Sequence, residues 1–339
     1  SALKSHLESL GHEVIRVVRS APTGTDIPWS PAEGRIDPHA LDGVDAVVHL
    51  AGAGIGDARW TDDYKRELLE SRTKGTTLIA ETIASADNGP KVFLSGSAIG
   101  IYGSRGDEEL TEQSAAGDGF LADICVQWEQ ATAAAEAAGV RVVHLRTGIV
   151  LSAKGGALKK QLPLFKFGLG GRMGSGNQWQ SWISIDDEVA AITHLLTADT
   201  SGPVNLTAPK PVTNAEFTDT LGDVLHRPTF LPIPKFGPKL LLGGELADNL
   251  LFSGQRVLPA LLNADAGFTF QHPDLATALG RTAAVAAACD AAVEACRRVP
   301  YDLVLMDCRM PVMDGYELIE QLRHDAATDH IAIMLLTAS

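Results

Sequence analysis

The sequence predicts an α/β fold in which helices cover both faces of a doubly wound parallel sheet. Short apolar runs alternate along the chain with longer amphipathic segments, which is the pattern of successive βαβ units. Residues 92–94 contain no polar side chain, as is typical of a strand buried on both faces. Ser95, Gly96 and Ser97 follow this run, and their small side chains indicate that a site opens at the end of the strand.

The expected elements follow one another from the start of the sequence. Residues 1–10 carry leucines on one side of a helix that ends at Gly11, and an apolar strand follows at residues 12–18. Further strands are expected at residues 45–52, 91–96, 141–152 and 204–208, and helices at residues 61–85, 118–139 and 214–226.

The first predicted helix and strand are the second half of a βαβ unit. The strand and glycine-rich turn that complete this unit would precede Ser1, so we expect the sheet to lack its first strand. In the strand order 3-2-1-4-5-6, that strand lies between residues 12–18 and residues 45–50. Three explanations stay open: a fragment of a longer reading frame, a fusion, or a strand supplied from elsewhere, such as the apolar residues 303–306.

Composition and charge narrow the class of protein. With 339 residues, of which 45% are hydrophobic and 21% charged, the chain is long enough for two soluble domains. A formal net charge of −14 would repel a nucleic-acid backbone or an anionic membrane, unless a local basic patch overrides the sum. We therefore expect no nucleic acid and no membrane as partner. The four cysteines lack metal-ligand spacing, and neither a membrane span nor a signal peptide is evident, which favours a cytoplasmic protein.

Seven blocks of sequence, in order, carry a family resemblance. They are HLAGAGIGDARWTDDYKRELLESRTKGT (residues 49–76), SGSAIGIYG (95–103), FLADICVQWE (120–129), LRTGIVLS (145–152), GGRMGSGNQWQSWISIDDEV (170–189), VNLTAPKPVTNAEF (204–217) and SGQRVLPALLNADAGFTF (253–270). Through them, residues 1–281 resemble the extended short-chain dehydrogenase/reductase superfamily, and within it the epimerase-like, nucleotide-sugar epimerase family with a DUF1731-type C-terminal segment. The resemblance implies a Rossmann-like, NADP-binding domain over residues 1–152 and a small substrate-side region over residues 153–281.

The loop after the strand at residues 45–52 is expected to contact the cofactor. Its residues have little side-chain bulk, so a flat cofactor can lie against their backbone at the carboxyl edge of the sheet. A tight turn without a ligand is the alternative interpretation. The resemblance implies that the nicotinamide ribose and pyrophosphate are lined by Leu50, Ala51, Gly52, Ala53, Ser95 and Gly96.

Two arginines favour NADP(H) over NAD(H). Arg16 and Arg19 lie at the end of the second strand, where an acidic residue would bind the ribose of NAD. A guanidinium at this position would instead pair with the 2′-phosphate of NADP. Arginines that are merely exposed to solvent are the alternative.

Ser97 and Tyr102 are the predicted catalytic residues, because they bring two hydroxyl groups to the end of the strand at residues 91–96. In the superfamily that the chain resembles, a Tyr followed four residues later by a Lys transfers the proton. Here Leu121 and Cys125 occupy those two positions, and neither can replace the usual residue. Carbonyl reduction by the usual mechanism is therefore in doubt, and a purely structural Tyr102 stays an alternative.

Residues 153–181 predict a flexible basic lid. The segment contains seven glycines and five cationic residues but no acidic residue, in an otherwise acidic chain. Such a loop could close over an anionic group of the cofactor or of a nucleotide-linked substrate. A solvated loop is the alternative. Asp186, which follows it, is expected to be a helix N-cap rather than a metal ligand.

The last residues resemble a different family. The segment YDLVLMDCRMPVMDGYELIEQLR (residues 301–323), followed by IAIMLLTAS, is similar to a response-regulator receiver domain, a flavodoxin-like fold. The resemblance implies that Asp307 is the phosphoacceptor and that Thr337 senses the phosphoryl group, with Mg²⁺ as cofactor and a histidine kinase as partner. Residues 283–339 cover only part of such a domain and lack its paired acids and its lysine, so we expect no efficient phosphorylation.

The sequence thus leads to three hypotheses. The first is an NADP(H)-dependent epimerase or oxidoreductase that acts on a small and anionic substrate and is impaired by the lack of the glycine-rich turn. The second is a phosphorelay receiver whose output is carried by the larger domain. The third is a pseudoenzyme that binds the cofactor for regulation, which the residues at positions 121 and 125 favour.

Overall fold

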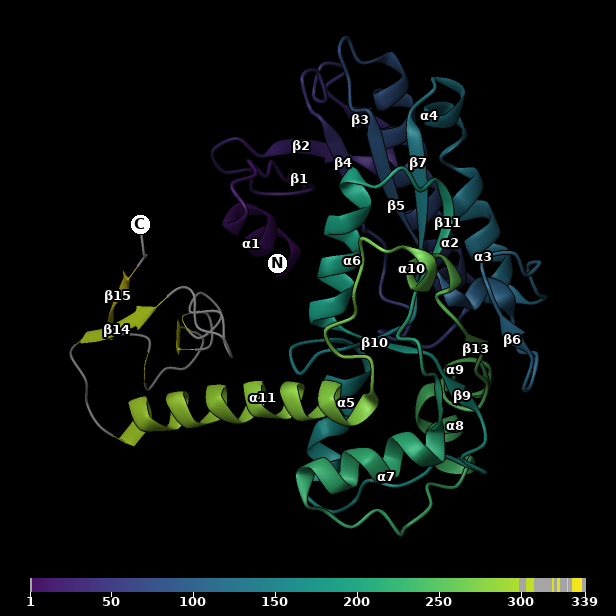
Figure 1. The fold of residues 1–339 in the computed structure, drawn as a ribbon, viewed down its shortest axis with the longest axis vertical. Helices are drawn as coiled ribbons and strands as arrows, with labels where there is room; N and C mark the ends of the chain where they lie inside the picture. Colours follow the sequence, from purple (N-terminus) through teal and green to yellow (C-terminus); the bar gives the residue numbers. More distant parts are fainter. Residues whose placement is uncertain are drawn as a thin grey trace.

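A parallel sheet of four strands forms the centre of the molecule (Figure 1). The computed structural model describes residues 2–298, 303–307, 319, 322–323, 328 and 331–336. The strands lie in the order β11-β7-β5-β4, and Leu94 of β5 is directly opposite Val143 of β7. The four strands are β4 (Ala46–His49), β5 (Val92–Ala98), β7 (Arg141–Thr147) and β11 (Gly202–Leu206).

Helices cover both faces of this sheet, which confirms the predicted doubly wound α/β class. Phe93 of β5 packs with α2 and α4 on one face, whereas Leu94 packs with α6 on the other. Because side chains alternate along a strand, Ser95 and Ser97 lie on the same face as Phe93. The helices around the sheet are α1 (Ala2–Ser9), α2 (Asp62–Ser85), α3 (Phe120–Gln130), α4 (Ala133–Ala137) and α6 (Ile185–Thr197).

A second sheet of three short strands lies beside the first. It consists of β1 (Val17–Val18), β2 (Ile27–Ser30) and β3 (Arg35–Ile36). The strand predicted at residues 12–18 is therefore wrong in extent, because only Val17 and Val18 find a partner strand, β2. Within the described ranges, β4 pairs only with β5, as expected if the first strand of the order 3-2-1-4-5-6 is absent. Residues 303–306 do not fill this position, since their strand pairs with β15.

Two predicted elements are each divided in two. The strand expected at residues 141–152 breaks at Gly148, where a Cβ atom would lie 2.5 Å from the carbonyl oxygen of Ser181. The chain beyond the break, β8 (Ile149–Leu151), pairs with β10 (Trp182–Ser184) instead of with the central sheet. The helix expected at residues 118–139 is interrupted between α3 and α4.

The segment predicted to be a flexible lid is in large part a packed helix. Residues Gly156–Lys166 form α5, and its Leu158, Leu162 and Phe165 are buried. These three apolar residues are spaced so that they lie on one face of a helix. This spacing was not used in the prediction, which considered only the glycine-rich composition of the segment. The prediction of a flexible lid is therefore wrong for residues 156–166.

Short elements surround the carboxyl edge of the sheet. The predicted helix at residues 214–226 is confirmed as α7, which begins with a capping box formed by Thr213 and Glu216. Helix α7 spans Asn214–Leu225. The other short elements of the molecule are η1 (Pro31–Glu33), η2 (Ile99–Tyr102), β6 (Glu109–Leu110), β9 (Trp179–Gln180), β12 (Val212–Thr213), α8 (Phe236–Leu242), α9 (Gly244–Leu250), β13 (Arg256–Val257) and α10 (Ala260–Ala264).

The N-cap of α6 is Ser184 and not Asp186, so that prediction was wrong. The Ser184 side chain accepts a hydrogen bond from the backbone N–H of Asp187. Asp186 instead contacts His272 and Arg281 through its carboxylate. Asp187 is completely buried and accepts hydrogen bonds from the backbone N–H groups of Gln271 and His272, which fixes the start of α6 to the C-terminal segment.

A single long helix, α11 (Leu275–Arg298), leads out of this body toward the last strands (Figure 1). The expected boundary at residue 282 therefore lies inside a helix. Residues 283–298 are helical throughout. Strands β14 (Leu303–Asp307) and β15 (Ala332–Leu336) form a parallel pair beyond it. In the part of the chain that the structure describes, no helix is long and apolar enough to cross a membrane.

Candidate functional site

The loop after β4 presents open backbone at the carboxyl edge of the sheet. Leu50, Ala51 and Gly52 are exposed, and the side chain of Leu50 is 50% accessible to solvent. Ala53 is anchored, because its backbone N–H donates a 3.0 Å hydrogen bond to Ser71 Oγ. We call residues 50–53 the β4 strip. Its open backbone provides a surface on which a ligand can lie.

A cation lies directly beneath the β4 strip. A Cβ atom on Gly52 would lie 3.3 Å from the guanidinium carbon of Arg72. This guanidinium stacks on Trp128 with its carbon 5.0 Å from the ring centroid, and it donates to the carbonyl oxygen of Leu68. Burial lowers the pKa of Arg72, and the residue pairs with no carboxylate among the described residues. Arg72 therefore places positive charge where an anionic ligand on the strip would need it.

The loop that follows the strip and the start of α2 are held by three helices from residues 153–281. Lys160 of α5 donates a 3.1 Å hydrogen bond to the carbonyl oxygen of Gly56. Arg59 donates to the carbonyl oxygens of Leu240 and Leu241 in α8, and Lys65 forms an ion pair with Glu245 of α9. These contacts fix one wall of the site, although Lys160 and Glu245 are far from Gly56 and Lys65 in sequence.

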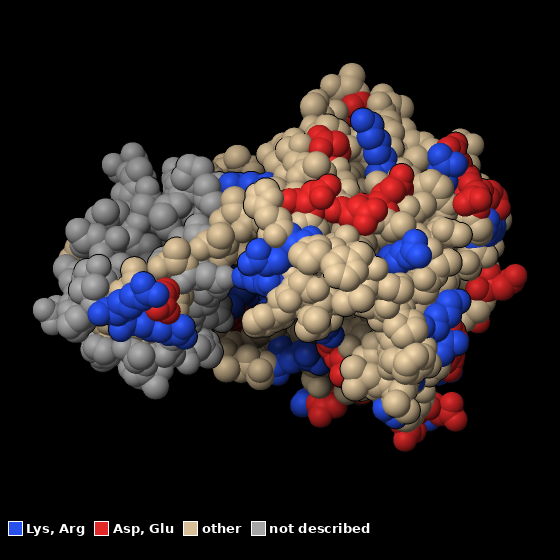
Figure 2. Space-filling model, turned by 90° about the horizontal axis from the view of Figure 1, so that it is seen from below, with Lys and Arg blue, Asp and Glu red and all other residues tan. Residues whose placement is uncertain are grey.

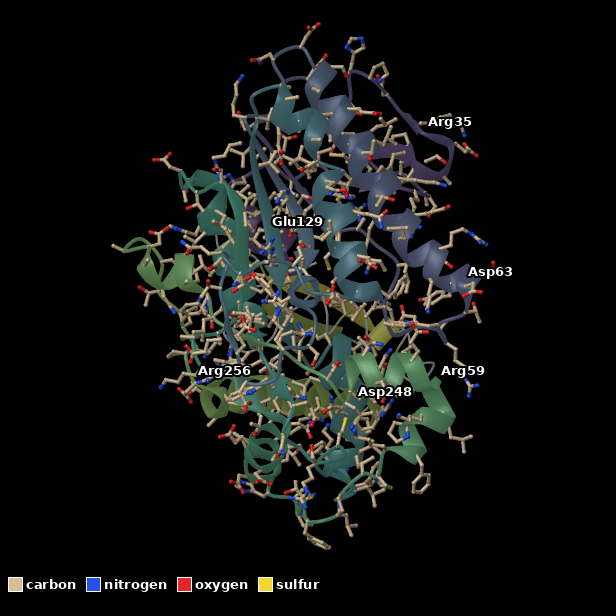
Figure 3. All side chains as sticks on the ribbon, turned by 90° about the vertical axis from the view of Figure 1, so that its right-hand side faces the viewer. Arg35, Arg59, Asp63, Glu129, Asp248 and Arg256 are labelled. Atoms are coloured by element: carbon tan, nitrogen blue, oxygen red, sulfur yellow. The ribbon has the colours of Figure 1, made fainter. Side chains whose placement is uncertain are left out.

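Ser97 is tied to a buried ion pair on the α3 face of the sheet. Its hydroxyl donates a 2.7 Å hydrogen bond to Glu129 Oε1. Arg146 of β7 binds both carboxylate oxygens of Glu129, at 2.8 and 2.9 Å. Figure 3 shows Glu129 in the interior of the molecule, whereas the labelled Arg59 and Asp63 reach its outer surface. Burial opposes ionisation of Glu129, but the hydrogen bonds and charge of Arg146 outweigh it and lower the pKa of Glu129.

Tyr102 belongs to the same network but is completely buried. Its hydroxyl accepts a 2.9 Å hydrogen bond from Arg146 and donates a 2.7 Å bond to Asn205 Oδ1. Burial raises the pKa of Tyr102, so the phenol keeps its proton. Asn205 in turn donates to the carbonyl oxygen of Leu258. In this arrangement Tyr102 joins β7 to β11 and to the C-terminal segment.

The two positions where the superfamily has its Tyr and Lys are apolar in structure as well as in sequence. Cys125 is buried against η2, and burial raises the pKa of its thiol to about 12. Leu121 lies next to it on α3, with its Cβ near Gly100. Neither side chain can exchange a proton at neutral pH.

A second line of polar groups leads from Glu129 toward the surface. His144 Nδ1 lies 3.9 Å from Glu129 Oε2, and its Nε2 lies 3.0 Å from Thr132 Oγ1. Thr132 also donates a 2.9 Å hydrogen bond to Glu136, whose side chain is 51% exposed. Burial lowers the pKa of His144 despite the two carboxylates nearby. His144 therefore has polar neighbours on α3 and α4.

The two predicted NADP-selecting arginines have different environments. Arg16 is held by Asp26, which accepts hydrogen bonds of 2.9 and 2.6 Å from it, and by Thr23. These residues line a shallow hollow of about 360 Å³ together with Lys4 and other residues around β1. Arg19 is exposed at the end of β1. Asp26 was not predicted at this place, because it lies ten residues after Arg16.

Of the two predicted receiver residues, Asp307 and Thr337, only Asp307 lies in the part of the chain that the structure describes. Asp307 ends β14 and is directly opposite Leu336, the last residue of β15. The position after it, Thr337, lies outside the described residues, as do most of the residues between the two strands. Within the described ranges, no group of three or more metal-binding side chains is present.

Sequence reasoning missed the residues that hold the site together. Glu129, Arg146 and Asn205 were not among the predicted site residues. The signal was present, because a charged residue at position 146 and a polar residue at position 205 each follow an apolar residue within a predicted strand. Arg72 could not be distinguished in the sequence from the other charged residues of its amphipathic helix.

Comparison with known proteins decides the family. The family model described as NAD dependent epimerase/dehydratase family matches residues 1–207. An epimerase family protein of Mycobacterium bovis is 46% identical over 282 residues, which cover 83% of this chain and 92% of the relative. The chain belongs to the NAD dependent epimerase/dehydratase family. An epimerase family protein of Bacillus subtilis is also similar, at 37% identity over 80% of this chain and 90% of its own length.

A solved structure agrees with this assignment, and two further family models match the C-terminal part of the chain. The crystal structure of a human epimerase family protein with NADPH has 34% identity and a TM-score of 0.76, and the match covers 83% of this chain and 94% of that one. The domain of unknown function DUF1731 matches residues 233–282, and the response regulator receiver domain matches residues 274–339. The resemblances to the epimerase-like family and to a receiver segment are thereby confirmed. The overlap of the two models falls on α11.

Proposed function

We propose that this member of the epimerase/dehydratase family is an NADP(H)-dependent oxidoreductase or epimerase whose cofactor lies on the β4 strip. The observation that supports this most is the exposed backbone of residues 50–53 with the buried cation of Arg72 beneath it. In this proposal residues 1–152 bind the cofactor, residues 153–281 bind an anionic small-molecule substrate, and Ser95 and Gly96 border the strip from β5.

The residues present fit a dinucleotide. Backbone without bulky side chains allows close approach, and an arginine without a carboxylate partner would hold negative charge at the strip. Arg19 and Arg16 would hold the 2′-phosphate that distinguishes NADP from NAD, with Asp26 keeping Arg16 in place. The human relative that was crystallised with NADPH supports this choice of cofactor.

The bound cofactor would supply or accept a hydride. Ser97 would accept a hydrogen bond from a substrate hydroxyl, since it is the polar group near the end of β5 and its own proton is donated to Glu129. Glu129 and Arg146 would fix the position of Ser97, and Tyr102 would fix Arg146. Because Leu121 and Cys125 replace the usual proton donor and its cation, we expect slow turnover or none, with NADP(H) binding retained.

NADPH titration by tryptophan fluorescence tests the proposal, since Trp128 lies against Arg72. We expect saturable binding that Ala51→Phe weakens at least about tenfold, because the larger side chain would occupy the strip. Ala137→Phe, at another exposed alanine on α4, should leave binding unchanged. No binding by the parent chain, or equal binding by the two variants, would refute the proposed site. Binding without NADPH oxidation across a panel of carbonyl compounds would identify a pseudoenzyme.

A phosphorelay role for the C-terminal segment is the second candidate. The observation that favours it is the parallel pairing of β14 and β15, which places Asp307 at one edge beside Leu336. Incubation with acetyl phosphate and Mg²⁺, followed by a phosphate-affinity gel, tests it. A band shift that Asp307→Asn abolishes would support the receiver function. An unshifted parent chain would leave only the cofactor-binding function.

A further inference from the structure

Two long segments of this acidic chain contain no acidic residue. They are residues 153–185 and residues 224–244. In a protein with a formal net charge of −14, such segments concentrate positive charge locally. Their cationic residues are Lys154, Lys159, Lys160, Lys166, Arg172, Arg227, Lys235 and Lys239.

The fold brings these two segments side by side. Arg227 donates a 2.8 Å hydrogen bond to the carbonyl oxygen of Lys166 at the end of α5. Farther along, the backbone of Ile233 donates to Arg172 and accepts from Gly174, at 2.9 and 3.0 Å. The two segments therefore form one continuous surface, although about sixty residues separate them in sequence.

This surface also exposes large apolar side chains. Eight of the thirteen large hydrophobic residues that are exposed in the described part of the chain lie in these two segments. Phe167, Phe230 and Leu240 are the most exposed, at 80%, 78% and 79%. We call the surface the apolar-basic face, and its apolar members are Leu164, Phe167, Leu169, Phe230, Leu231, Phe236, Leu240 and Leu241.

The apolar side chains are presented by ordered structure. Leu164 lies in the last turn of α5, and Phe167 is the C-cap residue of that helix. Phe236 and Leu240 are four residues apart on α8 and therefore share one side of it. Arg59 holds the end of α8 through the carbonyl oxygens of Leu240 and Leu241. Exposed aromatic and aliphatic groups on rigid supports can insert into an apolar phase without first being ordered.

Acidic groups reach this surface mainly from its border. Asp57 and Asp248 each pair with one of its lysines, Lys160 and Lys239. Asp219 and Asp223 lie on the adjoining helix α7. Figure 2 looks at the molecule from below and shows Lys and Arg side chains spread around uncharged surface, with a band of acidic side chains beside it and further acidic side chains toward the edge of the view.

We propose that the apolar-basic face binds to the surface of an anionic lipid bilayer. Aromatic and leucine side chains that insert between lipid headgroups, surrounded by lysines and arginines, are the two components of interfacial membrane binding. A second copy of the chain fits less well, since a two-fold contact would place the same cations against each other. The net negative charge predicts no membrane partner, but the local charge of this face is opposite in sign. No membrane-spanning helix is needed.

Vesicle flotation of the full chain tests the proposal. We expect the protein to float with vesicles of phosphatidylcholine and phosphatidylglycerol, and to remain unbound with phosphatidylcholine alone. The triple variant Phe167→Ser, Phe230→Ser and Leu240→Ser should reduce the partition coefficient at least about tenfold, and so should Lys159→Glu with Lys166→Glu. High salt should weaken binding by the parent chain.

Matched controls change residues of the same type elsewhere. Leu10→Ser removes an exposed leucine outside the face, and Lys91→Glu reverses an exposed lysine. Both should float like the parent chain. Absence of flotation with anionic vesicles, or flotation that the face variants do not reduce, would overturn the proposal. So would a dimer in light scattering that the triple serine variant dissociates, because the face would then be a contact between copies.

Discussion

At the scale of single residues, the centre of the candidate site is an ion pair buried between β7 and α3. Glu129 and Arg146 are paired through two hydrogen bonds, and each also binds a hydroxyl group, Ser97 for Glu129 and Tyr102 for Arg146. A buried pair of this kind stabilises little relative to apolar residues, but either charge alone is costly to bury. The main effect of this pair is therefore to fix the position of Ser97, and its net contribution to the stability of the fold is small.

A double-mutant cycle tests the pairing. Arg146→Met should lower the free energy of unfolding by about 3–5 kcal/mol, because Glu129 would be left as a buried charge. Glu129→Gln in the same chain should recover part of this loss, so that the double variant is more stable than the sum of the single variants predicts. Urea unfolding at neutral pH measures all three. Strict additivity would show that the two side chains do not interact.

Glu188 predicts a pH dependence of stability. It is buried, it accepts one hydrogen bond from Thr147, and its Oε2 atom has no partner within the described part of the chain. Burial raises its pKa to about 8. Between about pH 4.5 and pH 8 the unfolded chain loses this proton while the folded chain keeps it, so the contribution of Glu188 to stability falls as pH rises.

The variant Glu188→Gln removes this titration. We expect it to gain stability relative to the parent chain as pH rises from 5 to 8, by at most about 1.4 kcal/mol per pH unit. Urea unfolding at both pH values measures the difference. A stability difference that is the same at pH 5 and pH 8 would show that Glu188 does not stay protonated in the folded chain.

At the scale of elements, Asp187 connects the start of α6 to the C-terminal segment. Its carboxylate accepts hydrogen bonds from Ser184 Oγ and from the backbone of Gln271 and His272. Asp187→Ala would leave two backbone N–H groups without this acceptor, and we expect a loss of about 2–4 kcal/mol. Asp186→Ala, at the neighbouring and more exposed carboxylate, should cost less than about 1 kcal/mol. Thermal unfolding of both variants makes the comparison, and equal losses would contradict it.

The same elements show what sequence reasoning can reach. The buried strand at residues 92–98 and the helix at Asp62–Ser85 were predictable, since each has a local pattern of its own. The division at Gly148 was not, because it depends on the distant carbonyl of Ser181. Strand β1 was predicted too long because its length is set by its partner β2. Polar contacts between strands, such as Tyr102 with Asn205, depend on sheet order and are invisible in a single strand.

At the scale of the whole molecule, two parts of the chain contribute different elements to the candidate site. The Rossmann-like half contributes the β4 strip and the arginines near β1, while α5, α8 and α9 hold the loop that follows the strip. The wall of the site therefore depends on contacts between residues that are more than a hundred positions apart. These contacts could not be predicted from the sequence, because they depend on how distant segments pack together.

The arginines predict the cofactor preference of the molecule. Arg19→Ala should weaken NADPH binding about tenfold, since a charge-assisted contact with the 2′-phosphate would be lost, and should leave NADH binding unchanged. Arg35→Ala, at an exposed arginine in β3 that pairs with Glu33, is the matched control. Titrations with both cofactors measure the ratio of the dissociation constants for NADPH and NADH. Equal losses for NADPH and NADH would place Arg19 outside the phosphate site.

The central claim is that NADP(H) lies on the β4 strip, and hydrogen–deuterium exchange of the full chain with and without NADPH tests it most directly. We expect NADPH to slow exchange in peptides that cover residues 50–61 and 92–103, since the strip and the end of β5 would become shielded. Exchange in α11 should not change. Unchanged exchange at residues 50–61 under saturating NADPH, or protection confined to other peptides, would contradict the account.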